Sequence, residues 1–235
     1  MSALSPRDRM IVPLDVPTVD DAYAIIDDLG DSVSFYKIGY QLGYAGGFDL
    51  ARDLIADDKD VFMDLKLLDI DNTIEKGVIS IRDMGAKFLT IHAYPKAMRA
   101  AVQGRGDTNL NLLGVTVLTS MDDADLAEAG YLISAKDLVA KRAANARAAG
   151  MDGIVCSAQE AGAMRAIVGP DMSIVTPGIR PEGTDIGDQK RVMTPSKAIA
   201  AGADYLVVGR PILQADNRSD MARRITDDIA KALEK

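Results

Sequence analysis

Three charged side chains interrupt an apolar run in the early part of the chain. The run begins with Val61-Phe62-Met63 and continues as Asp64-Leu65-Lys66-Leu67-Leu68-Asp69. In a strand, successive side chains face opposite sides, so Asp64 and Lys66 become neighbours on one face. Burying a carboxylate and an ammonium is unfavourable unless they pair, and even a good pair is often no more stable than apolar residues of similar size. The pattern therefore indicates chemistry rather than packing.

The two aspartates determine what Lys66 can do. Nearby negative charge stabilises the ammonium form and keeps a proton available for donation. A lysine that forms a Schiff base needs instead a depressed amine pKa, which burial or a neighbouring cation provides. The spacing of Asp64, Lys66 and Asp69 thus favours a proton donor over the nucleophile of an aldolase. A buried ion pair that only fills the fold is the remaining alternative.

Eight short apolar or β-branched runs predict the strands that hold these residues. They are Met10–Val16, Phe35–Leu42, Val61–Leu68, Phe88–Tyr94, Asn111–Thr119, Gly153–Ala158, Ser173–Ile179 and Tyr205–Ile212. Segments of helical periodicity lie between them, and the clearest are Val19–Leu29, Phe48–Ala56, Ser134–Ala149 and Ser219–Leu233. Eight strand–helix repeats without a linker predict an α/β fold, a single-domain (β/α)8 TIM barrel over residues 1–235. A doubly wound sheet is the alternative, but it usually has a Gly-rich turn that is missing after Val16.

The barrel prediction places functional residues at the C-terminal ends of the strands. The polar residues at those ends are Asp15, Lys37, Asp64 with Lys66, His92, Thr119, Arg180 and Arg210. Arg210 follows Gly209 after the eighth strand, where many barrels bind a phosphate. The longest loop, residues 181–189, follows the seventh strand, and its glycines and polar residues suit a mobile lid. We therefore expect one site at this rim.

Several of these segments resemble the orotidine 5′-monophosphate decarboxylase family. The resemblance rests on Phe35-Tyr36-Lys37-Ile38-Gly39, on residues 64–73, on Pro177-Gly178-Ile179-Arg180 with residues 188–192, and on Val207-Val208-Gly209-Arg210-Pro211. It implies a carboxy-lyase that converts orotidine 5′-monophosphate to uridine 5′-monophosphate, the last step of de novo pyrimidine synthesis. It also implies a homodimer in which each active site is completed by the partner subunit. Bacterial members often have His and Pro where this chain has Leu68 and Asp71, so Asp71 adds a carboxylate beside Asp69.

The resemblance also implies roles for individual residues. Lys66 would donate a proton to C6 of the pyrimidine, Asp64 would lie against the substrate carboxylate, and Asp69 would enter from the other subunit. Lys37 would extend this catalytic network and, with Asp15, contact ribose hydroxyls. The other implied substrate contacts are Ile70, Asn72, Thr73, Thr119, Arg180, Gln189, Gly209 and Arg210. Of these, Thr119 would bind the pyrimidine edge, Ile70 and Thr73 would reach the neighbouring site, and Gln189, Gly209 and Arg210 would bind phosphate with help from Arg180. Thr73 could also cap a helix that starts near Ile74.

Decarboxylation leaves a carbanion, which most enzymes stabilise with an electron-accepting cofactor. Nothing in the sequence suggests such a cofactor, so we expect electrostatic stabilisation by fixed charges and neither cofactor nor metal. His92 is the only histidine, and without spaced ligands a zinc site is not expected. We interpret His92 as a packed residue near the rim, and Cys156 as a small buried apolar residue.

Charge and composition limit the kinds of partner that we expect the protein to bind. The chain has 27 basic and 35 acidic residues and a net charge of −8, which is not the electrostatic footprint of a nucleic-acid-binding protein. No segment approaches the roughly 18 apolar residues of a membrane span, and the N-terminal residues lack an apolar signal region. The single cysteine fits a reducing compartment. We expect a cytoplasmic protein that binds a pyrimidine nucleotide.

Two further alternatives share part of the pattern. Magnesium-dependent enzymes that act on 3-keto-gulonate 6-phosphate or make hexulose phosphate also carry an Asp-x-Lys-x-x-Asp strand. Thr119, Gln189 and residues 177–180 favour a pyrimidine nucleotide over an open-chain sugar. A phosphate-binding barrel without catalysis could keep Arg210 and Gln189, but it has no reason to keep Lys66 and both aspartates.

Overall fold

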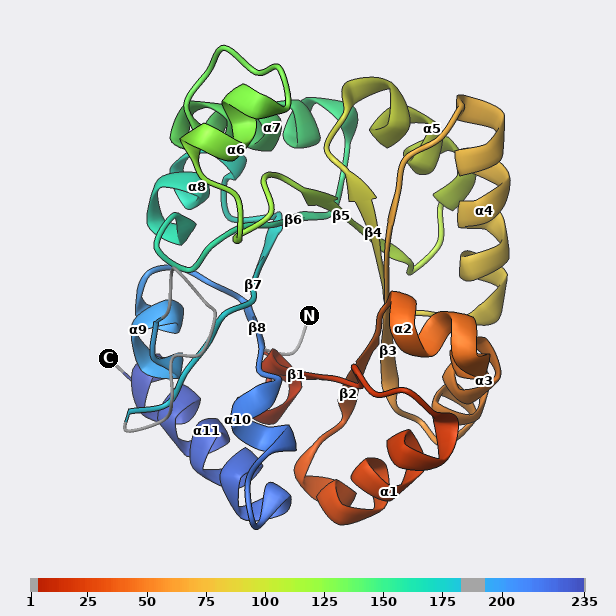
Figure 1. The fold of residues 1–235 in the computed structure, drawn as a ribbon, viewed down its shortest axis with the longest axis vertical. Helices are drawn as coiled ribbons and strands as arrows, with labels where there is room; N and C mark the ends of the chain where they lie inside the picture. Colours follow the sequence, from red (N-terminus) through yellow and green to blue (C-terminus); the bar gives the residue numbers. More distant parts are fainter. Residues whose placement is uncertain (1–3, 183–192, 235) are drawn as a thin grey trace.

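A closed barrel of eight parallel strands forms the centre of the molecule (Figure 1). The structure is a computed structural model that describes residues 4–182 and 193–234. The strands are β1 Met10–Pro13, β2 Phe35–Ile38, β3 Asp60–Leu67, β4 Phe88–His92, β5 Asn111–Val115, β6 Gly153–Val155, β7 Ser173–Thr176 and β8 Tyr205–Val207. Each pairs with the next along the chain, and β8 closes the ring against β1. The (β/α)8 barrel prediction is confirmed, and the doubly wound sheet is excluded.

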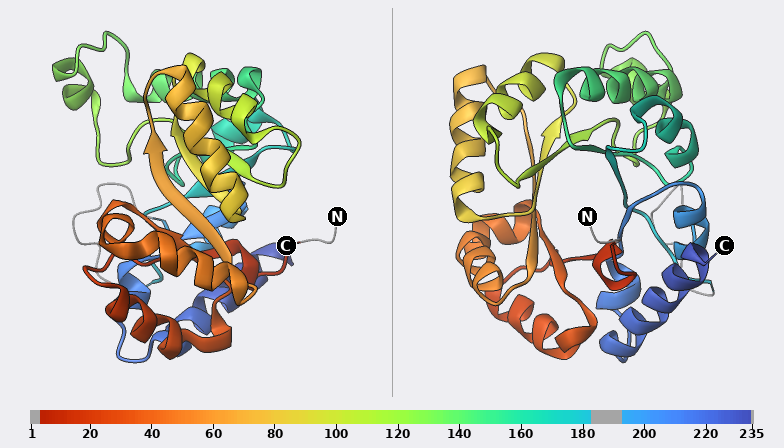
Figure 2. Two further views of the ribbon diagram at one scale, coloured as in Figure 1. Left: turned by 90° about the vertical axis from the view of Figure 1, so that its right-hand side faces the viewer. Right: turned by 180° about the vertical axis from the view of Figure 1, so that it is seen from behind.

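Helices cover the outside of the barrel all the way round (Figures 1 and 2). The α-helices are α1 Val19–Leu29, α2 Tyr40–Leu42, α3 Phe48–Ala56, α4 Asp71–Met84, α5 Pro95–Arg105, α6 Asp123–Glu128, α7 Ala135–Ala149, α8 Ala161–Val168, α9 Pro195–Ala200, α10 Arg210–Leu213 and α11 Arg218–Leu233. Shorter helical turns are η1 Arg7–Arg9, η2 Gly30–Ser32 and η3 Gly43–Gly47. The segment that carries α6 projects from one end of the barrel (Figure 2).

The predicted helix bounds agree closely with the structure. Helices α1 and α3 begin and end at the predicted residues, while α7 starts one residue later and α11 one residue earlier. Each difference is explained by a cap, because Ser134 accepts a hydrogen bond from the Asp137 amide and Asn217 accepts one from the Asp220 amide. Side-chain oxygens at such positions satisfy amides that have no partner inside the helix.

The predicted strands begin at the right place and end too late. Seven start at the predicted residue, β3 starts one residue earlier, and all eight end before the predicted residue. Tyr40–Leu42, predicted as strand, forms helix α2, and Ile212 lies in α10. Residues beyond the strand ends, such as Val117 and Ile179, are still buried. Because these loop residues are buried, their apolar pattern resembles a continuing strand.

The barrel interior has an apolar lower layer. Its members are Ile11, Phe35, Phe62, Phe88, Leu113, Val175, Tyr205 and Val207, and Leu4 packs against them from the start of the described chain. The rings of Phe35, Phe88 and Tyr205 contact each other edge to face, with centroids 4.9–6.0 Å apart. A second and larger apolar cluster includes the buried faces of the helices. The apolar layer supports the polar end of the barrel above it.

Candidate functional site

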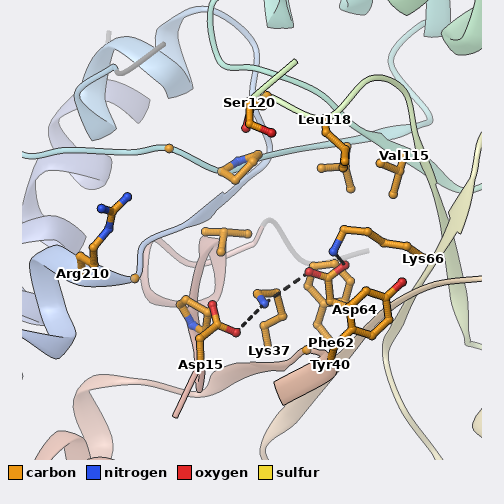
Figure 3. A pocket seen from close by; sticks show the side chains of 18 of the residues that line it. Asp15, Lys37, Tyr40, Phe62, Asp64, Lys66, Val115, Leu118, Ser120 and Arg210 are labelled. Carbon is orange, nitrogen blue, oxygen red and sulfur yellow. Dashed lines mark hydrogen bonds and ion pairs between the residues drawn. The ribbon is translucent and has the colours of Figure 1, made fainter. Parts of the chain in front are cut away.

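A cavity of about 560 Å³ opens at the C-terminal ends of the strands (Figure 3). Its lining includes eight of the predicted site residues, namely Asp15, Lys37, Asp64, Lys66, Thr119, Arg180, Gly209 and Arg210. Phe62, Val115, Val155 and Val207 add apolar surface to the same cavity. Figure 3 shows Arg210 across the cavity from Lys66. The predicted residues thus meet at the rim that the barrel geometry indicated.

Four charged side chains of alternating sign form a continuous chain along one wall (Figure 3). The Lys37 ammonium lies 3.1 Å from Asp15 Oδ1 and 3.3 Å from Asp64 Oδ2, and the Lys66 ammonium lies 2.8 Å from Asp64 Oδ1. The Lys37 and Asp64 side chains are only 10% and 13% exposed, against 25% for Lys66 and 53% for Asp15. Burial of the two central charges is tolerated because each faces a group of opposite charge.

The pairing of Asp64 and Lys66 is confirmed, but a regular strand does not produce it. The register of β3 against β4 shifts between Met63 and Leu67, and Lys66 adopts a left-handed backbone with φ of 44°. An irregularity of this kind redirects a side chain at the edge of a barrel. The two charges therefore contact each other across a bulge. Leu68, predicted to fill the buried run, lies beyond the strand end and is half-exposed.

Two side chains that are not among the predicted site residues hold this bulge. The Thr90 hydroxyl accepts a hydrogen bond from the Lys66 amide at 2.9 Å and donates one to Asp64 Oδ1 at 2.9 Å. The Tyr40 hydroxyl donates to the Leu65 carbonyl at 2.9 Å, and its ring centroid lies 5.6 Å from the Lys66 ammonium. A signal for Thr90 was present, because it is a polar residue inside the apolar run that forms β4.

Gly39 leaves room for the charge network. A Cβ atom at this position would lie 3.2 Å from the Lys37 ammonium and 3.3 Å from Asp15 Oδ1. Those distances are tighter than ordinary van der Waals contact, so a side chain here would displace one of the two charges. The glycine after β2 thus allows Lys37 and Asp15 to approach each other.

The charges shift one another's proton affinity. Burial alone would raise the pKa of Asp64, but the ammonium groups of Lys37 and Lys66 and the hydrogen bonds from Lys66 and Thr90 hold it below its usual value. Burial alone would lower the pKa of Lys37, but the carboxylates of Asp64 and Asp15 raise it. Asp64 and Lys37 are therefore both charged at neutral pH.

The opposite end of the cavity is basic. Arg180 and Arg210 line it together with Pro177, Gly178 and Gly209, and Arg180 is 7% exposed. Guanidinium groups bind phosphate oxygens in pairs of parallel hydrogen bonds. A cavity with fixed ion pairs at one end and guanidinium groups at the other suits an elongated anionic ligand. Gln189, predicted here, lies outside the described residues, as does most of the predicted lid from residue 183 onward.

The predicted residues after β3 do not enter the cavity of their own chain. Asp69, Ile70, Asn72 and Thr73 are exposed, and none lines the cavity. The Asp69 carboxylate accepts a hydrogen bond from the Ile70 amide at 2.6 Å. Thr73 is not a cap, because α4 starts two residues earlier and Ile70 occupies its N-cap position.

The added carboxylate of Asp71 does not join the charge network. Its side chain forms an exposed ion pair with Lys96 at 3.3 Å. An exposed pair of this kind contributes little to stability. Within its own chain, Asp71 therefore pairs with Lys96 rather than with Lys66.

His92 lines a neighbouring cavity of about 330 Å³ with Tyr94, Leu118 and Arg142. Burial and the positive charges of Arg142 and Lys66 lower the pKa of His92. Cys156 is fully buried, and burial raises the pKa of its thiol to about 12, as suits a small apolar residue. Across residues 4–182 and 193–234, no group of three or more histidine, cysteine or acidic side chains is arranged to hold a metal ion. In the same part of the chain, no helix combines the length and apolarity needed to cross a membrane.

Comparison with known proteins identifies relatives over nearly the whole chain. Residues 8–225 match the model of the family described as orotidine 5′-phosphate decarboxylase / HUMPS. Proteins named orotidine 5′-phosphate decarboxylase from Rhodopseudomonas palustris (strain BisB5) and Afipia carboxidovorans are each 60% identical, over 96% and 97% of both chains respectively. One from Methylobacterium radiotolerans is 61% identical over 96% of this chain and 97% of its own. The crystal structure of orotidine 5′-phosphate decarboxylase from Lactobacillus acidophilus superimposes with a TM-score of 0.84 at 32% identity, covering 94% of this chain and 98% of that one.

Proposed function

Because the chain belongs to the orotidine 5′-phosphate decarboxylase / HUMPS family, we propose that it converts orotidine 5′-monophosphate to uridine 5′-monophosphate and CO2 in pyrimidine biosynthesis. We further propose that it does so without a cofactor and that Lys66 is the proton donor. The observation that carries the proposal is the chain of four alternating charges in the rim cavity. It occurs in a protein 60% identical to a relative named orotidine 5′-phosphate decarboxylase.

The reaction requires one bond to break and one to form at C6 of the pyrimidine. The bond between C6 and the carboxylate breaks, CO2 leaves, and the electron pair stays on C6. Lys66 then gives a proton from its ammonium to C6, and the neutral amine regains a proton from water. The ammonium is held 2.8 Å from Asp64 before the reaction starts, so little reorganisation is needed when negative charge develops.

Asp64 supplies the second electrostatic contribution. Its carboxylate is charged because Lys37 and Lys66 hold its pKa low. It opposes the negative charge of the substrate carboxylate but not the neutral CO2 that leaves. Lys37 keeps Asp64 in place and, with Asp15, contacts the ribose hydroxyls in our proposal.

The remaining residues orient the nucleotide along the cavity. The phosphate binds at Gly209, Arg210 and Arg180, with Gln189 as a further contact, and the pyrimidine edge binds at Thr119. This orientation places the reacting carbon at the end of the cavity that holds the ion pairs. Binding energy from the remote phosphate can then be used to position the reacting carbon.

We also propose that the protein acts as a homodimer with shared active sites. The support is the exposure of the segment that follows Lys66. Ile70 is 70% exposed, Asp69 is exposed beside it, and Leu68 is half-exposed. Large apolar side chains of this kind suit burial against a second copy, which would bring Asp69, Ile70, Asn72 and Thr73 to the partner's cavity.

The deciding experiment incubates the purified protein with orotidine 5′-monophosphate, with and without EDTA. We expect one uridine 5′-monophosphate and one CO2 per substrate molecule consumed, at equal rates in both samples. The absorbance of the orotate ring measures the consumption of substrate. No turnover would overturn the proposed activity. Loss of turnover in EDTA, with recovery on adding Mg²⁺, would overturn cofactor independence. Trapping of an adduct on Lys66 by borohydride and a keto-sugar phosphate would assign Lys66 to Schiff-base chemistry instead.

A further inference from the structure

We propose that Thr90 is a positioning residue that holds Asp64 and Lys66 in the arrangement needed for decarboxylation. The proposal rests on the proposed function. Thr90 lies in β4, is fully buried, and does not line the cavity, so it acts through the two charged residues rather than on the substrate.

A closed ring of hydrogen bonds carries the argument. The Lys66 amide donates to Thr90 Oγ1, Thr90 Oγ1 donates to Asp64 Oδ1, and the Lys66 ammonium donates to the same Oδ1. One hydroxyl therefore holds both the backbone of the lysine and the carboxylate that orients its side chain. Thr90 is fully buried, so in the folded chain its hydroxyl meets these two partners and not bulk solvent.

The backbone at Lys66 explains why a hydroxyl is needed there. Among the described residues outside glycine, only Asp58 and Lys66 have a positive φ, at 55° and 44°. Asp58 lies in an exposed turn, where its amide donates to the backbone carbonyl of Ile55. Lys66 lies inside a strand whose register shifts, and its amide has a side chain as acceptor. The strained conformation thus depends on a residue of the neighbouring strand.

Removal of the hydroxyl would loosen the proton donor. Asp64 Oδ2 would still face Lys37, but Oδ1 would lose one of its two donors. The carboxylate could then rotate toward Lys37, and the Lys66 ammonium would move with it. Small displacements of a catalytic group reduce turnover strongly, because the productive geometry is populated less often.

The test compares Thr90→Val, which keeps the shape and removes the hydroxyl, with Thr90→Ser, which keeps the hydroxyl. Thr176→Val is the matched control, because Thr176 is a fully buried strand threonine whose hydroxyl has no hydrogen-bond partner among the described residues. With orotidine 5′-monophosphate as substrate, we expect kcat to fall about 10- to 100-fold in Thr90→Val, as for the loss of a hydrogen bond to a charged group. KM should change by less than about threefold, because Thr90 makes no contact with the cavity. Thr90→Ser and Thr176→Val should keep kcat within about threefold of the wild type.

Three results would overturn the role of Thr90. They are an unchanged kcat in folded Thr90→Val, a loss in Thr90→Ser as large as in Thr90→Val, or an equal loss in Thr176→Val. Should Thr90→Val not fold, Thr90→Ala against Thr90→Ser gives the same comparison, because these two side chains differ by one oxygen. An inactive wild type would overturn the proposed function together with this role, whereas an active wild type with an unaffected Thr90→Val would overturn this role alone.

Discussion

The lower and upper layers of the barrel interior come from the same strands and have opposite chemistry. Three strands each place a phenylalanine in the lower layer and, two positions nearer the C-terminal end of the strand, a polar residue in what we call the upper layer. The pairs are Phe35 and Lys37, Phe62 and Asp64, and Phe88 and Thr90. Because side chains two apart in a strand share a face, each pair points into the barrel. The lower members pack ring against ring, while Lys37, Asp64 and Thr90 join the charge network.

The difference shows where this chain accepts a cost in stability. The lower layer gains free energy from burial of apolar surface. In the upper layer Lys37 and Asp64 lose their hydration, and this cost is offset by their contact with each other and with Asp15, Lys66 and Thr90. Apolar residues would fill the upper positions with equal or better stability. The charges are therefore explained by their action on a bound anion. Variants of the upper layer should mainly change turnover, and variants of the lower layer should mainly change the free energy of unfolding.

Lys66→Ala should show the largest effect on turnover. We expect kcat for orotidine 5′-monophosphate to fall by at least about 10⁴-fold, because the proton donor and a fixed positive charge are both lost. The free energy of unfolding should fall by only about 1.5–3 kcal/mol, as for the loss of one hydrogen bond to a charged group, since Asp64 keeps Lys37 and Thr90 as partners.

The matched control is Lys87→Ala. Lys87 forms an ion pair with Asp60 at 2.5 Å, at the opposite end of the same strand β3. This variant removes an ammonium of the barrel without touching the cavity, so turnover should stay near the wild-type value. Chemical denaturation and the absorbance assay measure both quantities. Normal turnover in Lys66→Ala would contradict the assignment of the proton donor.

Phe88→Ala should have the opposite effect to Lys66→Ala, with a large loss of stability and a small loss of turnover. Its ring is buried against Phe35, Phe62 and Tyr205, so its loss opens a cavity in the lower layer. We expect the free energy of unfolding to fall by about 3–5 kcal/mol. The kcat of the folded enzyme should fall less than tenfold, because the charges above keep their partners. If Phe88→Ala lost as much activity as Lys66→Ala at unchanged stability, the division between the layers would be wrong.

The two layers also differ in how far the sequence alone predicts them. The apolar runs that start at Phe35 and Phe88 predict where those strands begin, since their pattern follows from burial. Lys37 and Asp64 stand out because they are charges inside apolar runs. The left-handed backbone of Lys66 was not predictable, because it depends on a hydroxyl that another strand provides. The strand ends were wrong because buried loop residues continue the apolar pattern.

The lower layer is closed by its own chain, whereas we propose that the upper one is completed by a partner. A mixture of Asp69→Ala and Lys66→Ala chains tests this difference. Each mixed dimer would contain one intact site, so an equal mixture should recover activity in about a quarter of the sites. The measurement is the turnover of the mixture after subunit exchange, which differently tagged chains can verify. Each variant alone is the control, and a mixture no more active than the variants would show that the sites are not shared.

Acid titration should give the smallest difference between the layers. The folded-state pKa of Asp64 is lowered, mainly by Lys37 and Lys66 against the opposing effect of burial, so its ion pairs stabilise the fold above the unfolded-state pKa. This stabilisation is lost as the pH falls below about 4 and through the folded-state pKa. In Lys37→Met the pKa of Asp64 should be lowered less. The difference in unfolding free energy between wild type and Lys37→Met should therefore shrink as the pH falls from 7 to 3. Phe88→Ala removes no titratable group, and its curve should stay parallel to the wild type. A constant difference between wild type and Lys37→Met would mean that the pairing of Asp64 with Lys37 does not stabilise the folded state.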